Sequence, residues 1–173
     1  MALPEIALPH LKWLVEQTRL TAHLAILERS QAVFIQKVDG PGIIKFDTYV
    51  GKRADLHCTG VGKVLLAYAG EEIVQEILSV DSFPRYTNAT ITSPANLKKE
   101  LFVVRKKGYA VDDEEEELGV RCLGAPVLNQ SGEPVAAVSV TGTLSQVRRD
   151  RLDQLAEVVK QAAGRVSGAL QAL

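Results

Sequence analysis

The sequence has little of what several common protein classes need. Its two cysteines are too few for a disulfide framework or for a four-ligand zinc site. No apolar run approaches the roughly 20 residues that cross a membrane, and no basic start leads into the apolar segment of a secretory signal. The sequence also has no large excess of charge of one sign, because it contains 20 Lys and Arg and 21 Asp and Glu. The net charge of -1 disfavours binding of nucleic acid by bulk electrostatics.

The composition suits one soluble domain. Hydrophobic residues make up 46% of the 173 residues, which is enough for a full core. We expect one domain over residues 1–173, in the cytoplasm, with no cofactor. There is no internal repeat, and the acidic run 112–117 is the single biased tract. An apolar helical rhythm starts almost at the first residue, which predicts that residues 1–173 belong to a longer protein.

Hydrophobic periodicity predicts the order helix, strands, helices, strands, helix. Branched residues over 22–28 and 32–38 indicate an antiparallel hairpin. In the opening helix, Pro4 suits the start, whereas Pro9 either kinks the helix or marks its first turn. The other expected elements are a third strand over 43–50, helices over 60–69, 71–79 and 93–107, strands over 109–111, 122–129 and 134–141, and a helix from about 145. Because βαβ repeats are missing, the pattern favours an α+β fold with an antiparallel sheet and helices packed on it.

The last two strands are the most informative segment. A two-residue turn at 131–132 would set these opposed pairs: Leu128 with Val135, Gly124 with Ser139, and Cys122 with Thr141. Opposed residues share a sheet face, and alternation puts Ser139 and Thr141 on the same side. With Cys122 they form a polar patch beside the space left by Gly124, a candidate floor for a small polar ligand. Ordinary small residues on a solvated strand face would give the same pattern.

Residues 57–63, His-Cys-Thr-Gly-Val-Gly-Lys, precede an apolar helix. They resemble a P-loop only superficially, because position 57 is not Gly and Lys63 is followed by Val64. Glycines ahead of a helix still let N–H groups approach an anion, and the helix dipole favours a carboxylate there. The plain alternative is a glycine-eased turn into the helix.

The neighbouring His57 and Cys58 raise the question of a metal ion or a nucleophile. Adjacent side chains of an extended segment point to opposite faces, and no second His or Cys lies at ligand spacing. We therefore expect no metal and no catalytic residue here, but a buried or hydrogen-bonded His57. In the acidic run, Asp112 ends a strand and can point inward while residues 113–117 face water.

Four blocks together resemble the effector-binding domain of IclR-family bacterial transcription regulators. They are L-H-C-T-G-V-G-K-V-L-L-A at 56–67, K-K-G-Y-A-V-D-D-E-E at 106–115, G-V-R-C-L-G-A-P-V at 119–127 and V-A-A-V-S-V-T-G at 135–142. Four ordered blocks with matching separations are more specific than any one of them. The resemblance implies a GAF-like domain, with a central antiparallel sheet, flanking helices and a small-molecule pocket on one face. It also implies an N-terminal winged helix-turn-helix domain, which residues 1–173 lack.

The resemblance further implies the effector-binding residues. Backbone at Gly60 and Val61 would contact the effector. Side chains would come from Asp112, Cys122, Ser139 and Thr141, and apolar lining from Ile43, Phe46, Ala54 and Val120. Gly60 and Gly124 stand where many relatives have Ala, and Thr141 where some have Ser. We expect both glycines to enlarge the cavity.

The expected function is to sense a small molecule for a bacterial DNA-binding regulator. Donors at the helix start suit a ligand carboxylate, and an ionised Asp112 would accept from hydroxyl groups, which favours hydroxy, keto or sugar acids. The alternatives are a stand-alone GAF-like signalling domain for a nucleotide or chromophore, and an enzyme that uses Cys122 or His57. Apolar stripes on the first and last helices exceed what one small sheet covers, which predicts a homodimer or homotetramer. DNA would be bound only through the N-terminal domain.

Overall fold

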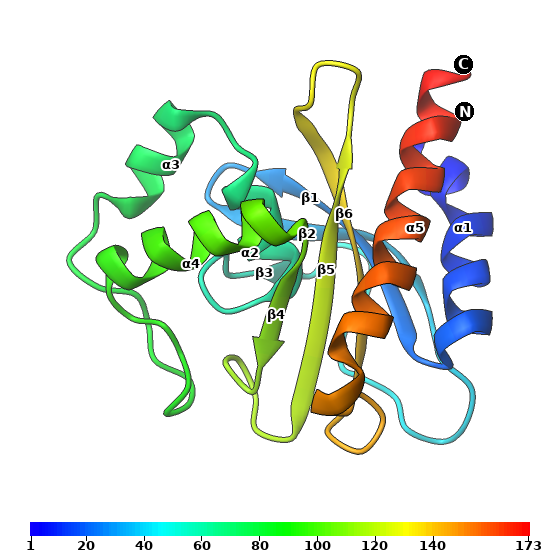
Figure 1. The fold of residues 1–173 in the computed structure, drawn as a ribbon, viewed down its shortest axis with the longest axis horizontal. Coiled ribbons are helices and arrows are strands. Elements are labelled where there is room, and N and C mark those ends of the chain that lie inside the picture. The colour runs from blue at the N-terminus through cyan, green and yellow to red at the C-terminus, as the bar shows by residue number, and fades with distance from the viewer.

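Six strands form one antiparallel sheet in the computed structural model, which describes residues 1–173 (Figure 1). The strands are β1 (Thr21–Glu28), β2 (Gln31–Val38), β3 (Arg53–Ala54), β4 (Ala110–Asp113), β5 (Val120–Leu128) and β6 (Pro134–Thr143). Their order across the sheet is β3-β2-β1-β6-β5-β4, so β1 and β6, from distant parts of the chain, are paired at the centre. The expected α+β class with an antiparallel sheet is confirmed.

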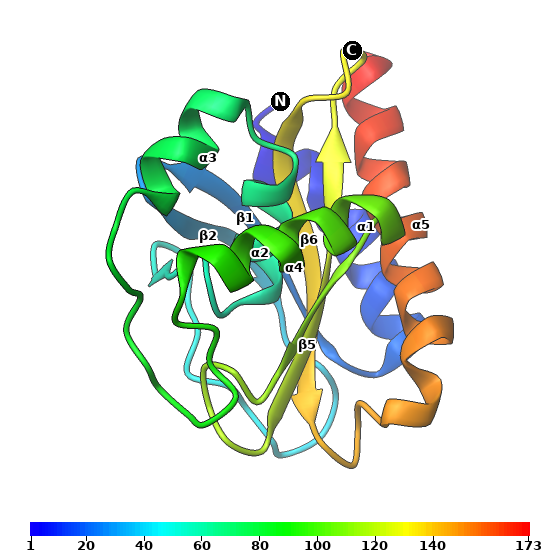
Figure 2. The same cartoon turned by 60° about the vertical axis from the view of Figure 1, so that its left-hand side comes forward.

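The helices cover the two faces of the sheet. They are α1 (Leu3–Thr18), α2 (Gly60–Ala67), α3 (Glu71–Leu78), α4 (Pro94–Lys107) and α5 (Leu152–Gln171), the last preceded by a short 3-10 turn, Arg149–Arg151. In Figures 1 and 2, α1 and α5 run side by side on one face, while α2 lies on the other with α3 and α4 outside it. No helix is long and apolar enough to cross a bilayer.

The larger core cluster lies between the sheet and the pair α1 and α5. Leu11 and Leu14 of α1 and Val159 and Val166 of α5 are fully buried in it, together with strand residues such as Val138. The apolar stripes of both helices are therefore covered within the chain. The apolar stripes therefore give no reason to expect an oligomer, and the homodimer or homotetramer stays a prediction.

The second core cluster lies under α2. All eight residues of α2 are buried, and its side chains pack against small strand residues such as Ala25 and Ala137. Side-chain caps begin both helices of this face: the Thr59 side chain accepts from the N–H of Gly62, and Ser93 caps α4. Gly108, at a φ of +84°, ends α4 in the left-handed region.

One prediction about local structure is wrong. Residues 43–50 form no strand, and the backbone carbonyls of Phe46 and Thr48 accept from the Lys37 ammonium. The edge strand β3 is only Arg53–Ala54, which pairs with β2. Of the two alternatives for Pro9, the first turn is excluded, because Pro4 occupies it and Pro9 lies inside α1.

The hairpin of β5 and β6 confirms the part of the register that bears on function. Its loop has three residues rather than two, because the N–H of Asn129 donates to the carbonyl of Glu133 and Gly132 takes a φ of +79°. A bulge at Leu128 absorbs the extra residue and places Leu128 opposite Pro134, not Val135. Beyond the bulge the pairs are as predicted: Gly124 with Ser139, and Cys122 with Thr141.

Candidate functional site: a ligand cavity on the sheet

A cavity of about 190 Å³ lies on the face of the sheet that α2 covers. Its walls come from the sheet, the start of α2, residues 46–52 and the acidic run. Nine of the ten residues nominated from the sequence line it: Phe46, Ala54, Gly60, Val61, Asp112, Val120, Cys122, Ser139 and Thr141. The tenth, Ile43, is 97% exposed and lies outside the cavity, because the strand expected at 43–50 does not form.

Polar residues form a row across three strands of the cavity floor. Thr141 of β6 opposes Cys122 of β5, and Cys122 opposes Asp112 of β4. The Thr141 hydroxyl donates to the Cys122 sulfur at 3.3 Å. Burial raises the pKa of the Cys122 thiol, so it stays protonated at neutral pH. This row presents hydroxyl, thiol and carboxyl groups, but no thiolate nucleophile.

Gly60 and Gly124 bring the start of α2 against β5. A Cβ at Gly124 would lie 2.7 Å from the carbonyl oxygen of Gly60, and a Cβ at Gly60 would lie 3.2 Å from the backbone nitrogen of Gly124. The space beside Gly124 is filled by the α2 backbone, so the expectation that the glycines enlarge the cavity is wrong. Their role is to permit close packing of two backbones.

The start of α2 offers backbone donors to the cavity. Of its first N–H groups, that of Gly62 donates to the Thr59 hydroxyl oxygen at 3.0 Å, and that of Lys63 to the Thr59 carbonyl at 3.0 Å. Gly60 and Val61 line the cavity, and their N–H groups have no partner inside the helix. The helix dipole adds partial positive charge there, which favours an anionic group of a ligand.

Asp112 points inward, as expected, and is 2% exposed. One carboxyl oxygen accepts from the N–H of Glu115 at 2.8 Å. Burial raises the pKa of Asp112 to about 7. Near neutral pH both forms therefore occur, so the group can accept or donate a hydrogen bond.

Lys63 was not identified from the sequence as a functional residue. The contacts of Lys63 also show that one residue of the acidic run is buried. The Lys63 ammonium is fully buried and donates to Glu115 at 2.9 Å, to Glu100 at 2.9 Å and to the carbonyl of Val111 at 2.6 Å. Burial opposes this charge, but Glu115 and Glu100 outweigh it and raise the pKa of Lys63. Glu115 is thus buried rather than facing water. The sequence signal that could have identified Lys63 is a charged residue among the otherwise apolar residues of α2.

Eight residues of the cavity wall were also missed, among them His23, Phe34, Thr48 and Lys52. His23 opposes Ser139 in the pairing of β1 with β6, a long-range register that local sequence patterns do not specify. Lys52 is the single lysine or arginine in the wall, whereas Asp47, Glu116 and Glu117 add carboxylates. The charge around the cavity is therefore predominantly negative, and backbone N–H groups are its main donors for an anion.

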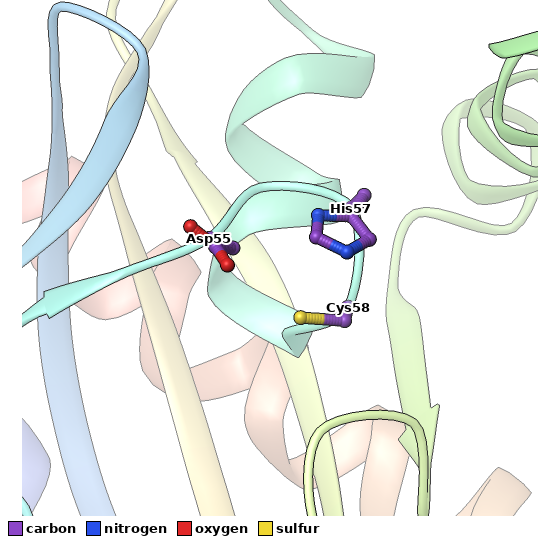
Figure 3. Close-up of side chains that lie close together, drawn as sticks. All are labelled: Asp55, His57 and Cys58. Carbon is purple, nitrogen blue, oxygen red and sulfur yellow. The ribbon is translucent and has the colours of Figure 1, made fainter. Parts of the chain in front are cut away.

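Asp55, His57 and Cys58 lie together in the loop before α2 (Figure 3). Their side-chain donor atoms are within 4.8 Å of one another, so the argument that His57 and Cys58 diverge is wrong, because residues 56–59 bend. The expected buried His57 is confirmed: it is hydrogen-bonded to the carbonyl of Pro84 at 2.8 Å. Asp55 accepts from Tyr86. Since both groups already have partners and burial raises the pKa of Cys58, this cluster anchors the loop.

A partly open cavity with polar residues on its floor, on one face of an antiparallel sheet, is typical of a small-molecule-binding domain. Comparison with known proteins identifies its family. Residues 1–168 match the family model described as bacterial transcriptional regulator IclR C-terminal. The transcriptional repressor IclR of Escherichia coli is 36% identical over 161 residues, which cover 92% of this chain and 59% of that protein.

Two solved structures have the same fold. The crystal structure of Thermotoga maritima IclR has a TM-score of 0.92 and 35% identity, over 98% of this chain and 69% of that one. An IclR homolog from Microbacterium hydrocarbonoxydans, complexed with 4-hydroxybenzoate, has a TM-score of 0.89 and 26% identity, over 99% of this chain and 69% of that one. The chain belongs to the IclR family of bacterial transcriptional regulators and corresponds to their C-terminal region. It spans about 59% of the length of the Escherichia coli relative.

Proposed function

We propose that residues 1–173 bind a small carboxylic acid as the effector of a bacterial transcription regulator. The observation that carries this proposal is the cavity itself, with free backbone donors at Gly60 and Val61 and the row Thr141, Cys122 and Asp112 on its floor. Pockets for drug-sized ligands have volumes of about 300–1,000 Å³. A cavity of about 190 Å³ therefore suits a smaller molecule.

The arrangement of donors and acceptors narrows the ligand class. A carboxylate fits at the start of α2, where the N–H groups of Gly60 and Val61 need an acceptor. A hydroxyl group fits at Asp112, which accepts when ionised. Hydroxy acids, sugar acids and the hydrates of keto acids have both groups, and Phe46 can cover an aromatic ring. The complex of the Microbacterium homolog with 4-hydroxybenzoate supports this class.

The same family membership supports a regulatory role for the whole protein. DNA would be bound through a domain outside residues 1–173, and the assembly would be a homodimer or homotetramer. An enzyme that uses Cys122 or His57 is not favoured, because burial raises the pKa of the Cys122 thiol and the Nε2 of His57 is already hydrogen-bonded to the carbonyl of Pro84. Nothing in the cavity or the family membership favours a nucleotide or a chromophore.

A binding screen tests the proposal directly. Thermal shift and titration calorimetry would compare benzoate, 3-hydroxybenzoate, 4-hydroxybenzoate, gluconate and glyoxylate on the same protein. We expect the tightest binder to carry a hydroxyl group. Asp112→Asn keeps an oxygen for the N–H of Glu115 but loses the carboxylate, so it should weaken this acid by about 1–3 kcal/mol at pH 8.

Benzoate is the matched control, because it has the carboxylate but no hydroxyl group. Its affinity should change little in Asp112→Asn. If the tightest binder lacks a hydroxyl group and is insensitive to the substitution, the assignment of the cavity is refuted.

A further inference from the structure

One side chain in the cavity wall has an unused hydrogen-bonding atom. His23, on β1, lines the cavity and is 1% exposed. Its Nδ1 is the one buried side-chain nitrogen or oxygen of the chain without a hydrogen-bond partner. Leaving a buried polar atom unsatisfied costs about 1–3 kcal/mol, so such atoms need a specific explanation. Because His23 belongs to the wall of a ligand cavity, a polar group of the ligand is the partner that would satisfy its Nδ1.

The rest of the imidazole ring is already held by the protein. Its Nε2 is hydrogen-bonded to the hydroxyl of Thr48 at 2.7 Å, and the ring lies 4.8 Å from the ring of Phe34. Thr48 is itself fixed, because its carbonyl accepts from the Lys37 ammonium at 2.8 Å. The orientation of the ring is thus set, and Nδ1 alone is left for a ligand.

His23 lies on the central strand β1, whereas Asp112 lies on the edge strand β4. His23 opposes Ser139 on β6, so both side chains project from the face that carries the cavity. Three strand intervals separate β1 from β4, which is about 14 Å along the sheet. A ligand group at His23 is therefore distinct from one at Asp112.

The chemistry of the ring defines the group it can bind. Burial, together with the nearby Lys37 ammonium, lowers the pKa of His23 to about 4, so the imidazole is neutral at pH 6–8. A neutral imidazole has one N–H and one acceptor nitrogen. If the Thr48 hydroxyl donates to Nε2, Nδ1 donates to the ligand; in the other tautomer Nδ1 accepts. A ligand hydroxyl satisfies either tautomer.

We propose that His23 is a specificity-determining residue whose Nδ1 forms a hydrogen bond with a hydroxyl group of the effector at the β1 end of the cavity. This inference rests on the proposed function, because it requires an effector in this cavity. It predicts which effectors bind best. An effector with a hydroxyl group at the β1 end binds more tightly, and an effector without this hydroxyl group does not depend on His23 for binding.

Two substitutions separate the two ring nitrogens. The amide of Asn is attached to Cγ, where Nδ1 is, whereas the longer Gln places its amide at the level of Nε2. His23→Asn therefore keeps a polar group for the ligand and loses the bond to Thr48. His23→Gln keeps the bond to Thr48 and loses the group that faces the ligand. Thr48→Val removes the same bond without changing the ring.

Affinity and stability should rank the two variants in opposite orders. For the tightest-binding of 3-hydroxybenzoate, 4-hydroxybenzoate and gluconate, His23→Gln should weaken binding about five- to tenfold, the size of one neutral hydrogen bond. His23→Asn should stay within about twofold of the wild type. Without ligand, His23→Asn and Thr48→Val should unfold at lower urea concentration than His23→Gln. Benzoate should bind the wild type and both His23 variants equally.

The opposite result has a clear meaning. If His23→Gln keeps its affinity, or if affinity and stability fall in the same order, His23 only holds residues 46–48 and the inference is refuted. If the wild type binds none of the acids, the proposed function fails. The stability series then still decides: His23→Gln as unstable as His23→Asn overturns the inference, because Nδ1 then has a partner within the protein.

Discussion

The buried carboxyl of Asp112 makes the stability of this domain depend on pH in an unusual direction. Burial raises its pKa from an ordinary value of 3.8 to about 7. Between these two values the folded protein binds more protons at this site than the unfolded chain does. Stability from this group is therefore present below pH 4 and is lost as the pH rises towards and through 7.

The magnitude follows from the shift. One pKa unit corresponds to 1.36 kcal/mol, so a shift of about three units is worth about 4 kcal/mol at most. Asp112→Asn cannot ionise and keeps the oxygen that accepts from Glu115. Relative to the wild type, this variant should gain stability between pH 5 and pH 8, by about 2–3 kcal/mol over that range.

Urea unfolding of both proteins at pH 5, 6, 7 and 8 measures this difference. Asp81→Asn is a control, because Asp81 is exposed and makes no ion pair, and its effect should stay within about 0.5 kcal/mol. A difference between Asp112→Asn and the wild type that is constant from pH 5 to pH 8, or that shrinks, would refute the reasoning.

Two further predictions concern the frame of the cavity. Lys63→Met leaves Glu115 buried without its partner and should cost about 3–5 kcal/mol in urea unfolding, whereas Lys160→Met, at an exposed ion pair, should cost under about 1 kcal/mol. Equal costs would mean that the buried pair has no special role. Gly124→Ala forces the α2 backbone away and should lower the melting temperature by several degrees, for about 1–3 kcal/mol. Gly164→Ala, on α5 where a Cβ meets nothing, should raise it; a harmless Gly124→Ala contradicts the packing described above.

Local chemistry in the sequence was sufficient for much of the fold. The caps Thr59 and Ser93 and the stop at Gly108 place α2 and α4, because each acts on backbone groups within a few residues. The register of β5 with β6 was predictable for the same reason, since one short loop sets it. The bulge at Leu128 was not predicted from the sequence. Because the loop has one residue more than predicted and the bulge absorbs it, the pairs beyond the bulge are still the predicted ones.

Long-range pairing accounts for what could not be predicted. The position of His23 depends on the pairing of β1 with β6, more than 100 residues apart, and no local pattern specifies it. Residues 43–50 have the branched composition of a strand but form none, and their contact with the Lys37 ammonium joins segments whose proximity no local pattern specifies.

The two sides of the cavity differ in how freely they can change. The floor residues Ser139 and Cys122 belong to a hydrogen-bonded ladder, and Gly60 is pressed against β5, so substitutions there disturb the framework. The opposite wall comes from residues 46–52, which lie outside the strands and bond to the β2 backbone only at Gly51 and Lys52. A biosensor for a new acid is therefore best sought by randomising Phe46 and Lys52 and screening for response, with the floor kept as it is.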